Sequence, residues 1–284
     1  MAILVADGGS TKTSWCLIDN GNKDYFETEG YHPFYVDEQY IQSSLKKNIP
    51  ENVLDSANKV EEIWLYSAGG KYSDKTDEIL INGLLPLFVN AQITIETDIL
   101  AAARALLQHK SGMAAILGTG SNTCIYDGKQ ITENIESLGF LIGDEGSGAY
   151  MGKLLISDFV RGYMPSEIKD IFNETYKLSP IDILNELYAT STPNRYCAKF
   201  AIFIKEYIDK AYLRELAYMN FDAFFKNIVS RYSSYNTYTF NAVGSIAYYF
   251  KEMINVVAQN YNMQISEISI SAINGLVEYH HHTI

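Results

Sequence analysis

A loop rich in small residues joins two short apolar runs near the start of the chain. The runs are residues 3–6 and 15–18, and the loop of residues 7–13 between them reads Asp-Gly-Gly-Ser-Thr-Lys-Thr. Short apolar runs bounded by turn residues are typical of buried strands. A Walker A loop and a Rossmann fingerprint both open a helix and have other glycine spacings, so the sequence excludes both. It predicts a β-hairpin instead.

The same arrangement recurs in the middle of the chain. Residues 114–117 and 123–126 are apolar, and the loop of residues 118–122 between them reads Gly-Thr-Gly-Ser-Asn. In both copies the second run ends at an aspartate close to a glycine, at Asp19 and at Asp127. Two such units indicate an internal duplication. One hairpin in each lobe could hold a polyphosphate chain from both sides.

The segment between the two hairpins has the pattern of an α/β unit. Residues 61–66 and 91–97 read as strands, and Asp98 opens an alanine-rich helix over residues 99–108. The turn at residues 110–112 is the first credible domain boundary. We therefore expect an α/β fold with an N-terminal and a C-terminal lobe.

The second half of the chain is mostly helical. Apolar residues recur at three- and four-residue spacings over residues 149–235, interrupted at three prolines. A strand over residues 240–243 then leads through Gly244 and Ser245 into a helix expected over residues 246–257.

Composition narrows the classes of partner. The 284 residues include 22 Lys and Arg against 34 Asp and Glu, a net charge of −12, which argues against general binding to nucleic acids or anionic membranes. No apolar run approaches the ~18 residues of a transmembrane helix, and the N-terminus lacks the pattern of a signal peptide. The three cysteines are scattered singly, which excludes a zinc ribbon and favours a reducing compartment. We expect a cytoplasmic protein, and no metal-binding role for the histidines at 280–282.

Asp7 ends the first strand directly before two glycines. The glycines let backbone N–H groups approach an anion, and Lys12 adds a positive charge. Because a carboxylate repels a bare phosphate, the natural ligand is Mg²⁺ with a nucleotide, and Asp7 would hold the metal or its waters. The alternative is a hairpin turn in which Asp7 satisfies its own backbone. The second glycine loop makes a nucleotide site the better interpretation.

Two further segments combine acidic side chains with helix starts. Asp98 could cap its helix, or it could act as general base for an attacking hydroxyl, and its position alone leaves both roles open. Residues 143–148 read Gly-Asp-Glu-Gly-Ser-Gly, which is too rich in glycine for an ordinary helix start. Their acidic pair could hold sugar hydroxyls or a metal-bound water, and a turn with an N-cap is the alternative.

The order of these segments resembles a known family. The two glycine loops, Asp98 before its helix, residues 143–148 and Val-Gly-Ser-Ile-Ala at 243–247 resemble the N-acetylglucosamine kinase-like branch of the sugar kinase, heat-shock ATPase and actin superfamily. That branch also includes ATPases that activate benzoyl-CoA reductases. The resemblance implies two ribonuclease-H-like lobes, residues 1–111 and 112–284, with a nucleotide cleft between them.

The resemblance also implies an activity and a set of site residues. The activity is ATP-dependent phosphorylation of the 6-hydroxyl of N-acetylglucosamine or a related amino sugar, with Asp98 as general base and Mg²⁺ held at Asp7. The closing segment, residues 275–284, is similar to a helix that packs on the first lobe. The implied nucleotide-binding residues are Asp7, Gly8, Gly9, Ser10, Thr11, Lys12, Gly118, Thr119, Gly120, Gly244 and Ser245. The implied substrate-binding residues are His32, Ser121, Asn122 and Asp144.

One position departs from the family pattern, and two other functions stay open. His32 stands where relatives commonly have Asn before Pro, so the choice among amino sugars is open, as is a homodimer. A reductase-activating ATPase would need two suitably placed cysteines in each subunit for a bridging iron–sulfur cluster, and only Cys197 lies away from the glycine hairpins. The other alternative is a non-catalytic, sugar-binding regulatory module.

Overall fold

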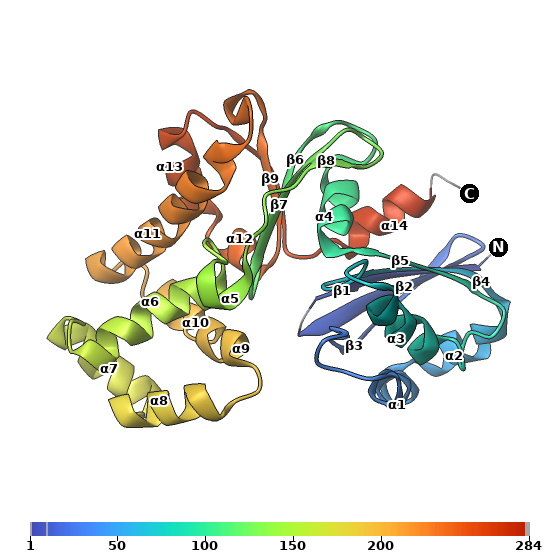
Figure 1. Ribbon diagram of the computed structural model, residues 1–284, viewed down its shortest axis with the longest axis horizontal. Coiled ribbons are helices and arrows are strands. Elements are labelled where there is room, and N and C mark those ends of the chain that lie inside the picture. Colours follow the sequence, from blue (N-terminus) through green and yellow to red (C-terminus); the bar gives the residue numbers. More distant parts are fainter. Residues whose placement is uncertain (1, 10, 282–284) are drawn as a thin grey trace. The chain divides into compact units, whose positions relative to one another are not determined.

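The chain forms two compact units of mixed α/β structure (Figure 1). The computed structural model describes residues 2–9 and 11–281. Unit 1 comprises Met1–Lys110, Asp127–Gln130 and Ser271–Ile284, and unit 2 comprises Ser111–Tyr126 and Ile131–Ile270. No helix in the described ranges has the length and apolar character that a membrane span requires.

Unit 1 contains a five-stranded sheet in the order β3-β2-β1-β4-β5. The first three strands are antiparallel neighbours, and β4 and β5 run parallel to β1. Its strands are β1 (Ala2–Gly8), β2 (Lys12–Asp19), β3 (Asn22–Glu29), β4 (Val60–Ser67) and β5 (Gln92–Thr97). Asn20 and Gly21, both with positive φ, form the tight turn between β2 and β3, as the Asn-Gly pair favours.

The helices of unit 1 lie in the connections between its strands and at the end of the chain. They are α1 (Glu38–Asn48), α2 (Glu51–Asp55), the 3₁₀ turn η1 (Ala57–Lys59), α3 (Asp74–Leu84), α4 (Asp98–Leu107) and α14 (Ile273–His281). The last of these, α14, packs on α4, β1 and β2. Because both faces of the sheet are covered, β1 reads as a nearly continuous apolar run rather than an alternating one.

Unit 2 repeats this sheet strand for strand. Its order is β8-β7-β6-β9-β10, with β6, β7 and β8 antiparallel and β9 and β10 parallel to β6. The strands are β6 (Gly112–Leu117), β7 (Ser121–Tyr126), β8 (Ile131–Glu133), β9 (Phe240–Val243) and β10 (Ile265–Ser269). The repeated topology is that of the duplication expected from the two glycine hairpins, and the predicted two-lobe α/β fold is confirmed.

A long helical segment separates β8 from β9 in unit 2. It contains α5 (Gly139–Ile142), α6 (Gly148–Arg161), α7 (Ser166–Tyr176), α8 (Pro180–Ala189), α9 (Pro193–Ala198), α10 (Ala201–Glu206), α11 (Ala211–Asn227), η2 (Val229–Arg231) and η3 (Tyr235–Thr237). The three prolines that interrupt the helical pattern each stand at a helix start, where the missing N–H is no loss.

The helix predicted over residues 246–257 is wrong in one respect. Two helices cover it, α12 (Ser245–Tyr249) and α13 (Lys251–Asn260), with a break at Phe250. The Phe250 side chain is buried, 5.9 Å from the ring of Phe221. The break between the two helices thus falls at a residue whose side chain packs in the core of unit 2.

In each unit the parallel strands end along one edge of the sheet. In unit 1, Gly8 pairs with Ser67 and Ser67 pairs with Thr97, so β1, β4 and β5 end in one row. In unit 2, Val243 pairs with both Ile116 and Ser269, so β6, β9 and β10 end in another. Loops at the carboxyl ends of parallel strands are the usual place for ligand sites in α/β folds.

Candidate functional site

Asp7 and Asp98 lie at the shared edge of unit 1. Asp7 is the next-to-last residue of β1, and Asp98 directly follows β5. Burial raises the pKa of both carboxyl groups. For Asp98 the pKa rises to about 6, with the charge of nearby Asp7 adding to the effect of burial. The edge thus holds two neighbouring carboxyl groups that are harder to ionise than ordinary aspartates.

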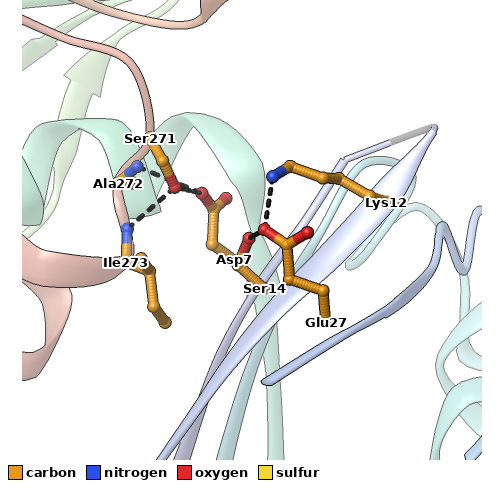
Figure 2. A network of polar contacts seen from close by, with 7 residues as sticks. All are labelled: Asp7, Lys12, Ser14, Glu27, Ser271, Ala272 and Ile273. Atoms are coloured by element: carbon orange, nitrogen blue, oxygen red, sulfur yellow. Dashed lines mark hydrogen bonds and ion pairs between the residues drawn. The ribbon is translucent and has the colours of Figure 1, made fainter. Parts of the chain in front are cut away.

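The start of the C-terminal helix holds the Asp7 carboxylate (Figure 2). The hydroxyl of Ser271 and the backbone N–H of Ala272 both donate to Asp7 Oδ2, each at 3.1 Å. Both bonds lower the pKa of Asp7 against the larger effect of burial. Ser271 and Ala272 are residues that the sequence analysis missed, because 264 and 265 positions separate them from Asp7.

The first glycine loop is a tight hairpin between β1 and β2. Gly9 N–H donates to the carbonyl of Lys12 at 3.0 Å, and a Cβ on Gly8 would lie 2.8 Å from the carbonyl oxygen of Tyr66. Thr11 is exposed, and its carbonyl accepts from Gly30 at 3.0 Å. Ser10, also expected to bind nucleotide, lies outside the described residues.

Two polar side chains of β2 differ in how they are satisfied. Lys12 is exposed and forms an ion pair with Glu27 on β3, which also accepts from Ser14 (Figure 2). The Lys12 ammonium group has three N–H donors and is exposed, so a phosphate could bind beside Glu27. Thr13 Oγ1 is buried and has no hydrogen-bond partner among residues 2–9 and 11–281. A buried hydroxyl without a partner beside a glycine loop is a natural place for a polar ligand atom.

Asp98 does not serve as the N-cap of α4. That position belongs to Thr97, whose Oγ1 accepts from Leu100 N–H at 3.3 Å. Asp98 is the first helical residue, and a hydrogen bond from the backbone of Ile99 partly offsets the rise of its pKa. The capping role that the sequence left open is thus filled by the preceding residue.

His32 lies in the loop after β3 and packs on a glycine turn at the edge of the sheet. A Cβ on Gly69, which has φ +84°, would lie 3.0 Å from His32 Cε1. The next glycine, Gly70, would place a Cβ 2.6 Å from the carbonyl oxygen of Glu96 on β5. This series of contacts runs from His32 to the strand end that precedes Asp98. The imidazole Nδ1 also accepts from Phe34 N–H at 3.4 Å.

The second glycine loop lies against the start of α6 in unit 2. Gly148 N–H donates to the Gly118 carbonyl at 2.8 Å, and Ala149 N–H donates to the Thr119 carbonyl at 3.1 Å. Gly118 N–H in turn donates to the Gly120 carbonyl at 3.0 Å. Open space surrounds the position that a Cβ on Gly118 would take. The segments 118–122 and 143–148, found separately in the sequence, therefore meet.

Asp144 faces the same loop. Ser121 N–H donates to Asp144 Oδ1 at 3.3 Å, and a Cβ on Gly120 would lie 3.2 Å from Asp144 Oδ2. Burial raises the pKa of Asp144, against hydrogen bonds from Ser121 and Ser137 and the charge of Lys153. Ser121 Oγ is buried and has no hydrogen-bond partner within the described part of the chain.

The side-chain oxygen of Asn122 already has hydrogen-bond partners within unit 2. Its Oδ1 accepts from Thr123 N–H at 2.9 Å and from Asn134 Nδ2 at 3.0 Å. Glu145, the other acid of the 143–148 segment, accepts from Asn227 Nδ2 at 2.9 Å. Of the polar residues in these two segments, Ser121 and Asp144 remain the stronger candidates for ligand contact.

Gly244 stands at the end of β9 against the second glycine loop. It has φ +120°, and a Cβ there would lie 2.3 Å from the Leu117 carbonyl oxygen and 3.2 Å from Gly118 N. Only glycine tolerates both this conformation and this close approach. Ser245 is exposed and begins α12. The 244–245 segment and the second glycine loop are therefore neighbours.

Each unit thus gathers its own share of the residues singled out in the sequence. Unit 1 holds Asp7, Gly8, His32 and Asp98 around one sheet edge. Unit 2 holds residues 118–122, Asp144 and Gly244 around the corresponding edge. Within residues 2–9 and 11–281, no three His, Cys, Asp or Glu side chains converge as a metal site. A metal at Asp7 would therefore depend on phosphate oxygens and water for its other ligands.

No protein-family model and no curated protein matches the chain. Solved structures do match it. A candidate N-acetylglucosamine kinase from Porphyromonas gingivalis is 33% identical, aligns over 99% of both chains and has a TM-score of 0.92. A candidate N-acetylglucosamine kinase from Chromobacterium violaceum, 14% identical over 98% of both chains, has a TM-score of 0.74. A ROK family glucokinase from Streptomyces griseus, in complex with glucose and AMPPNP, is 15% identical over 98% of both chains with a TM-score of 0.54.

The duplicated sheet and the full-length matches define a two-lobe protein of the actin-like ATPase type. The 33% identity over 99% of both chains narrows this class. The chain belongs to the N-acetylglucosamine kinase-like branch of the sugar kinase, heat-shock ATPase and actin superfamily, and the resemblance found in the sequence is confirmed.

Proposed function

We propose that this protein transfers a phosphoryl group from ATP to the 6-hydroxyl of N-acetylglucosamine or a closely related amino sugar. Membership of the family supports the coarser activity, which is ATP-dependent phosphorylation of a sugar. The likeness to a candidate N-acetylglucosamine kinase supports the choice of an amino sugar. The assignment of Asp98 as general base rests on its place at the strand end beside Asp7 and on its pKa, which burial and Asp7 raise to about 6. A general base is most effective when its pKa lies near the working pH.

Asp98 is assigned as the general base that accepts the hydroxyl proton. Thr97 fills the N-cap position, and among the described residues the Asp98 carboxylate accepts only from the backbone of the first turn at Ile99 and at its own residue. A high pKa makes the carboxylate a stronger proton acceptor, while at neutral pH most of the population is still ionised. Phosphoryl transfer otherwise demands mainly positioning and neutralisation of charge, so one such acceptor is enough.

The nucleotide is assigned to the two glycine loops, and Mg²⁺ to Asp7. Bound ATP would supply the phosphoryl group, and Mg²⁺ would offset the negative charge of the phosphates. In unit 1 the phosphates would contact the backbone at Gly8 and Gly9. In unit 2 they would contact the backbone at Gly118, Thr119 and Gly120. Among the described residues, none fills the space at Gly118 and none bonds the Thr13 hydroxyl, which supports ligand contact at both places.

The remaining nucleotide and sugar contacts follow the same reasoning. Gly244 and Ser245 are assigned to the adenosine because they adjoin the second loop. Asp144 and Ser121 are assigned to the sugar. The burial of both supports this, as does the lack of a partner for Ser121 Oγ in residues 2–9 and 11–281. Lys12, Thr11 and Ser10 are assigned to phosphate. A cytoplasmic location belongs to the same proposal.

The burial of the cysteines argues against the reductase-activating alternative. All three cysteines are fully buried: Cys16, Cys124 and Cys197. A cluster that bridges two subunits needs thiolates at a surface, and burial raises the pKa of Cys16 and of Cys197 to about 11. Neither thiol is therefore placed or ionised for such a cluster.

A coupled assay of ADP release tests the proposal. The purified protein is given Mg²⁺-ATP with glucosamine, N-acetylglucosamine, N-acetylmannosamine, N-acetylmuramic acid or glucose. We expect turnover with an N-acetylated amino sugar, and phosphorus NMR should identify the 6-phosphate. Turnover with glucose, and with none of the amino sugars, would show that the proposed substrate class is wrong. Sugar binding without release of ADP would establish the non-catalytic alternative instead.

A further inference from the structure

A pocket of about 560 Å³ lies within unit 2, and none of the residues assigned above lines it. It is formed by α5, α6, α8 and the segment that leads into the start of α9. The lining residues are Phe140, Leu141, Lys153, Ile156, Ser157, Val160, Arg161, Ile183, Leu184, Leu187, Tyr188, Thr190 and Pro193. Pockets of roughly 300–1,000 Å³ with mostly apolar walls are the usual form of a small-molecule site.

The charge of the lining is opposite to that of the whole chain. Lys153 and Arg161, both on α6, are cations, and none of the described residues that line the pocket is Asp or Glu. The chain as a whole has a net charge of −12. Two cations on a mostly apolar wall complement a ligand with an apolar body and one anionic group.

Apolar side chains at this pocket are unusually exposed. Leu141 is 83% exposed and Tyr188 is 84% exposed. Large apolar side chains gathered in this way commonly mark a binding site. An apolar ligand body would cover part of both side chains, and this burial would contribute to its affinity.

One wall of the pocket belongs to the segment that carries Asp144. Lys153 Nζ donates to the carbonyl of Phe140 at 2.9 Å and lies 5.0 Å from the centre of its ring. The α5 turn then leads through Gly143 to Asp144, whose N–H donates to the Ser137 carbonyl at 2.8 Å. Burial raises the pKa of Asp144 and the Lys153 charge opposes this rise, so Lys153 acts on both places.

We propose that this pocket binds a small amphiphilic anion, with its apolar body against α8 and its charge paired with the cations of α6, and that the Asp144 segment responds. The binding site itself does not depend on the proposed kinase activity. Its chemistry requires a carboxylate, sulfonate or phosphate on an aliphatic or aromatic body, and decanoate serves as the probe.

A tryptophan at the rim of the pocket reports binding. The native tryptophans, Trp15 and Trp64, both lie in unit 1, so Tyr188→Trp would place a reporter at the pocket with a constant background. Decanoate, below its micelle concentration, should shift the emission of this variant to the blue along a saturable curve. Tyr163→Trp is the matched control, since Tyr163 is 71% exposed in the same unit but does not line the pocket.

The charge requirement has its own controls. Decanol, with the same body and no charge, should bind at least tenfold more weakly than decanoate. Arg161→Gln should weaken decanoate binding at least fivefold, whereas Arg231→Gln, which removes an exposed arginine elsewhere in unit 2, should leave it unchanged. Equal binding of decanol and decanoate, or equal shifts in both tryptophan variants, would overturn the proposal.

Two further measurements test whether a second copy of the chain covers the pocket and whether the Asp144 segment responds to the ligand. If the Tyr188→Trp emission shifts with protein concentration, and decanoate has no effect, a second copy of the chain covers the pocket and the proposal is wrong. If decanoate binds, hydrogen exchange at the amides of Gly143 and Asp144 should slow at least threefold. Binding with unchanged exchange there would overturn the response of the Asp144 segment. Because exchange needs no turnover, the result is separate from that of the kinase assay.

Discussion

The two sheets have one strand order, yet the connections between their third and fourth strands differ greatly in length. In unit 1, residues 30–59 join β3 to β4, whereas in unit 2 residues 134–239 join β8 to β9. The short connection carries α1 and α2. The long one carries α5 to α11, and with them Asp144, the start of α6 and the apolar pocket. The duplicated sheet is thus a common frame, and the insertion gives unit 2 its own chemistry.

The two sheet edges also differ in charge. The edge of unit 1 carries Asp7 and Asp98, whose pKa values are both raised by burial. The strand ends of unit 2 carry glycines and the Ser121 hydroxyl, and its acid, Asp144, comes from the long connection. We infer that unit 1 supplies proton transfer and a metal ligand, while unit 2 supplies backbone approach to the nucleotide and contacts to the sugar.

Asp98→Asn should produce the largest effect. The amide cannot accept the hydroxyl proton, so kcat should fall by ~10²–10⁴. Asp144→Asn, at the other edge, should instead raise the KM for sugar more than it lowers kcat. Steady-state kinetics of both variants measure this contrast. A kcat for Asp98→Asn within threefold of the parent would show that Asp98 is not the base.

Asp98→Asn should also be more stable than the parent at pH 8. With a folded pKa of about 6 against an ordinary 3.8, Asp98 makes the folded chain bind more protons than the unfolded chain between these values. The free energy of unfolding therefore falls as the pH rises through this window, and above pH 6 the full penalty is present. Removing the charge should restore about 1–3 kcal/mol, measured by urea unfolding.

Glycines at the two corresponding strand ends should respond differently to alanine. A methyl group on Gly8 would lie 2.8 Å from the Tyr66 carbonyl oxygen, so Gly8→Ala should lower the free energy of unfolding by ~1–3 kcal/mol. At Gly118 the methyl group meets no atom of the described residues within 4 Å. Gly118→Ala should therefore keep its stability and raise the KM for ATP, because the methyl group fills ligand space. Equal losses of stability in both variants would contradict this difference.

Acid should weaken unit 1 through His280, which is buried in α14. Its Nε2 lies 2.9 Å from the Tyr66 hydroxyl, which accepts from Arg104 Nη1 at 2.7 Å. Burial, with the charge of Arg104, lowers the pKa of His280 to about 4 from an ordinary 6.5. The neutral ring therefore gives stability that is complete above pH 6.5 and is lost as the pH falls toward 4.

Tryptophan fluorescence can follow this loss, since both tryptophans lie in unit 1. Between pH 7 and pH 5 the His280→Gln variant should lose about 1–2 kcal/mol less stability than the parent, because glutamine keeps an acceptor and does not titrate. His281→Gln, at an exposed neighbouring position, is the control and should follow the parent. If all three proteins lose stability equally, His280 is not the group that titrates.

The sequence predicted the glycine hairpins and the strand that leads to Asp98 because these are short apolar runs with strong turn signals. It did not predict β3, whose residues Asn22–Glu29 are mostly polar and largely exposed at the edge of the sheet. Because β3 was not predicted, the ion pair between Lys12 and Glu27 could not be predicted either. The contact of Ser271 with Asp7 has no local signal, since it exists only once the chain returns to unit 1.

His32 should give the smallest effect, and it tests whether the edge of unit 1 also contributes to sugar recognition. Its contact with Gly69, and that of Gly70 with Glu96, bring it to the strand end that precedes Asp98. If the imidazole bonds a ring hydroxyl, His32→Ala should raise the KM for sugar roughly tenfold, with the KM for ATP little changed. His32→Asn, which restores the residue common in relatives, should keep a value near that of the parent. His109→Ala, at an exposed histidine elsewhere in unit 1, is the matched control. A sugar KM for His32→Ala equal to that of the control would assign sugar recognition to unit 2 alone.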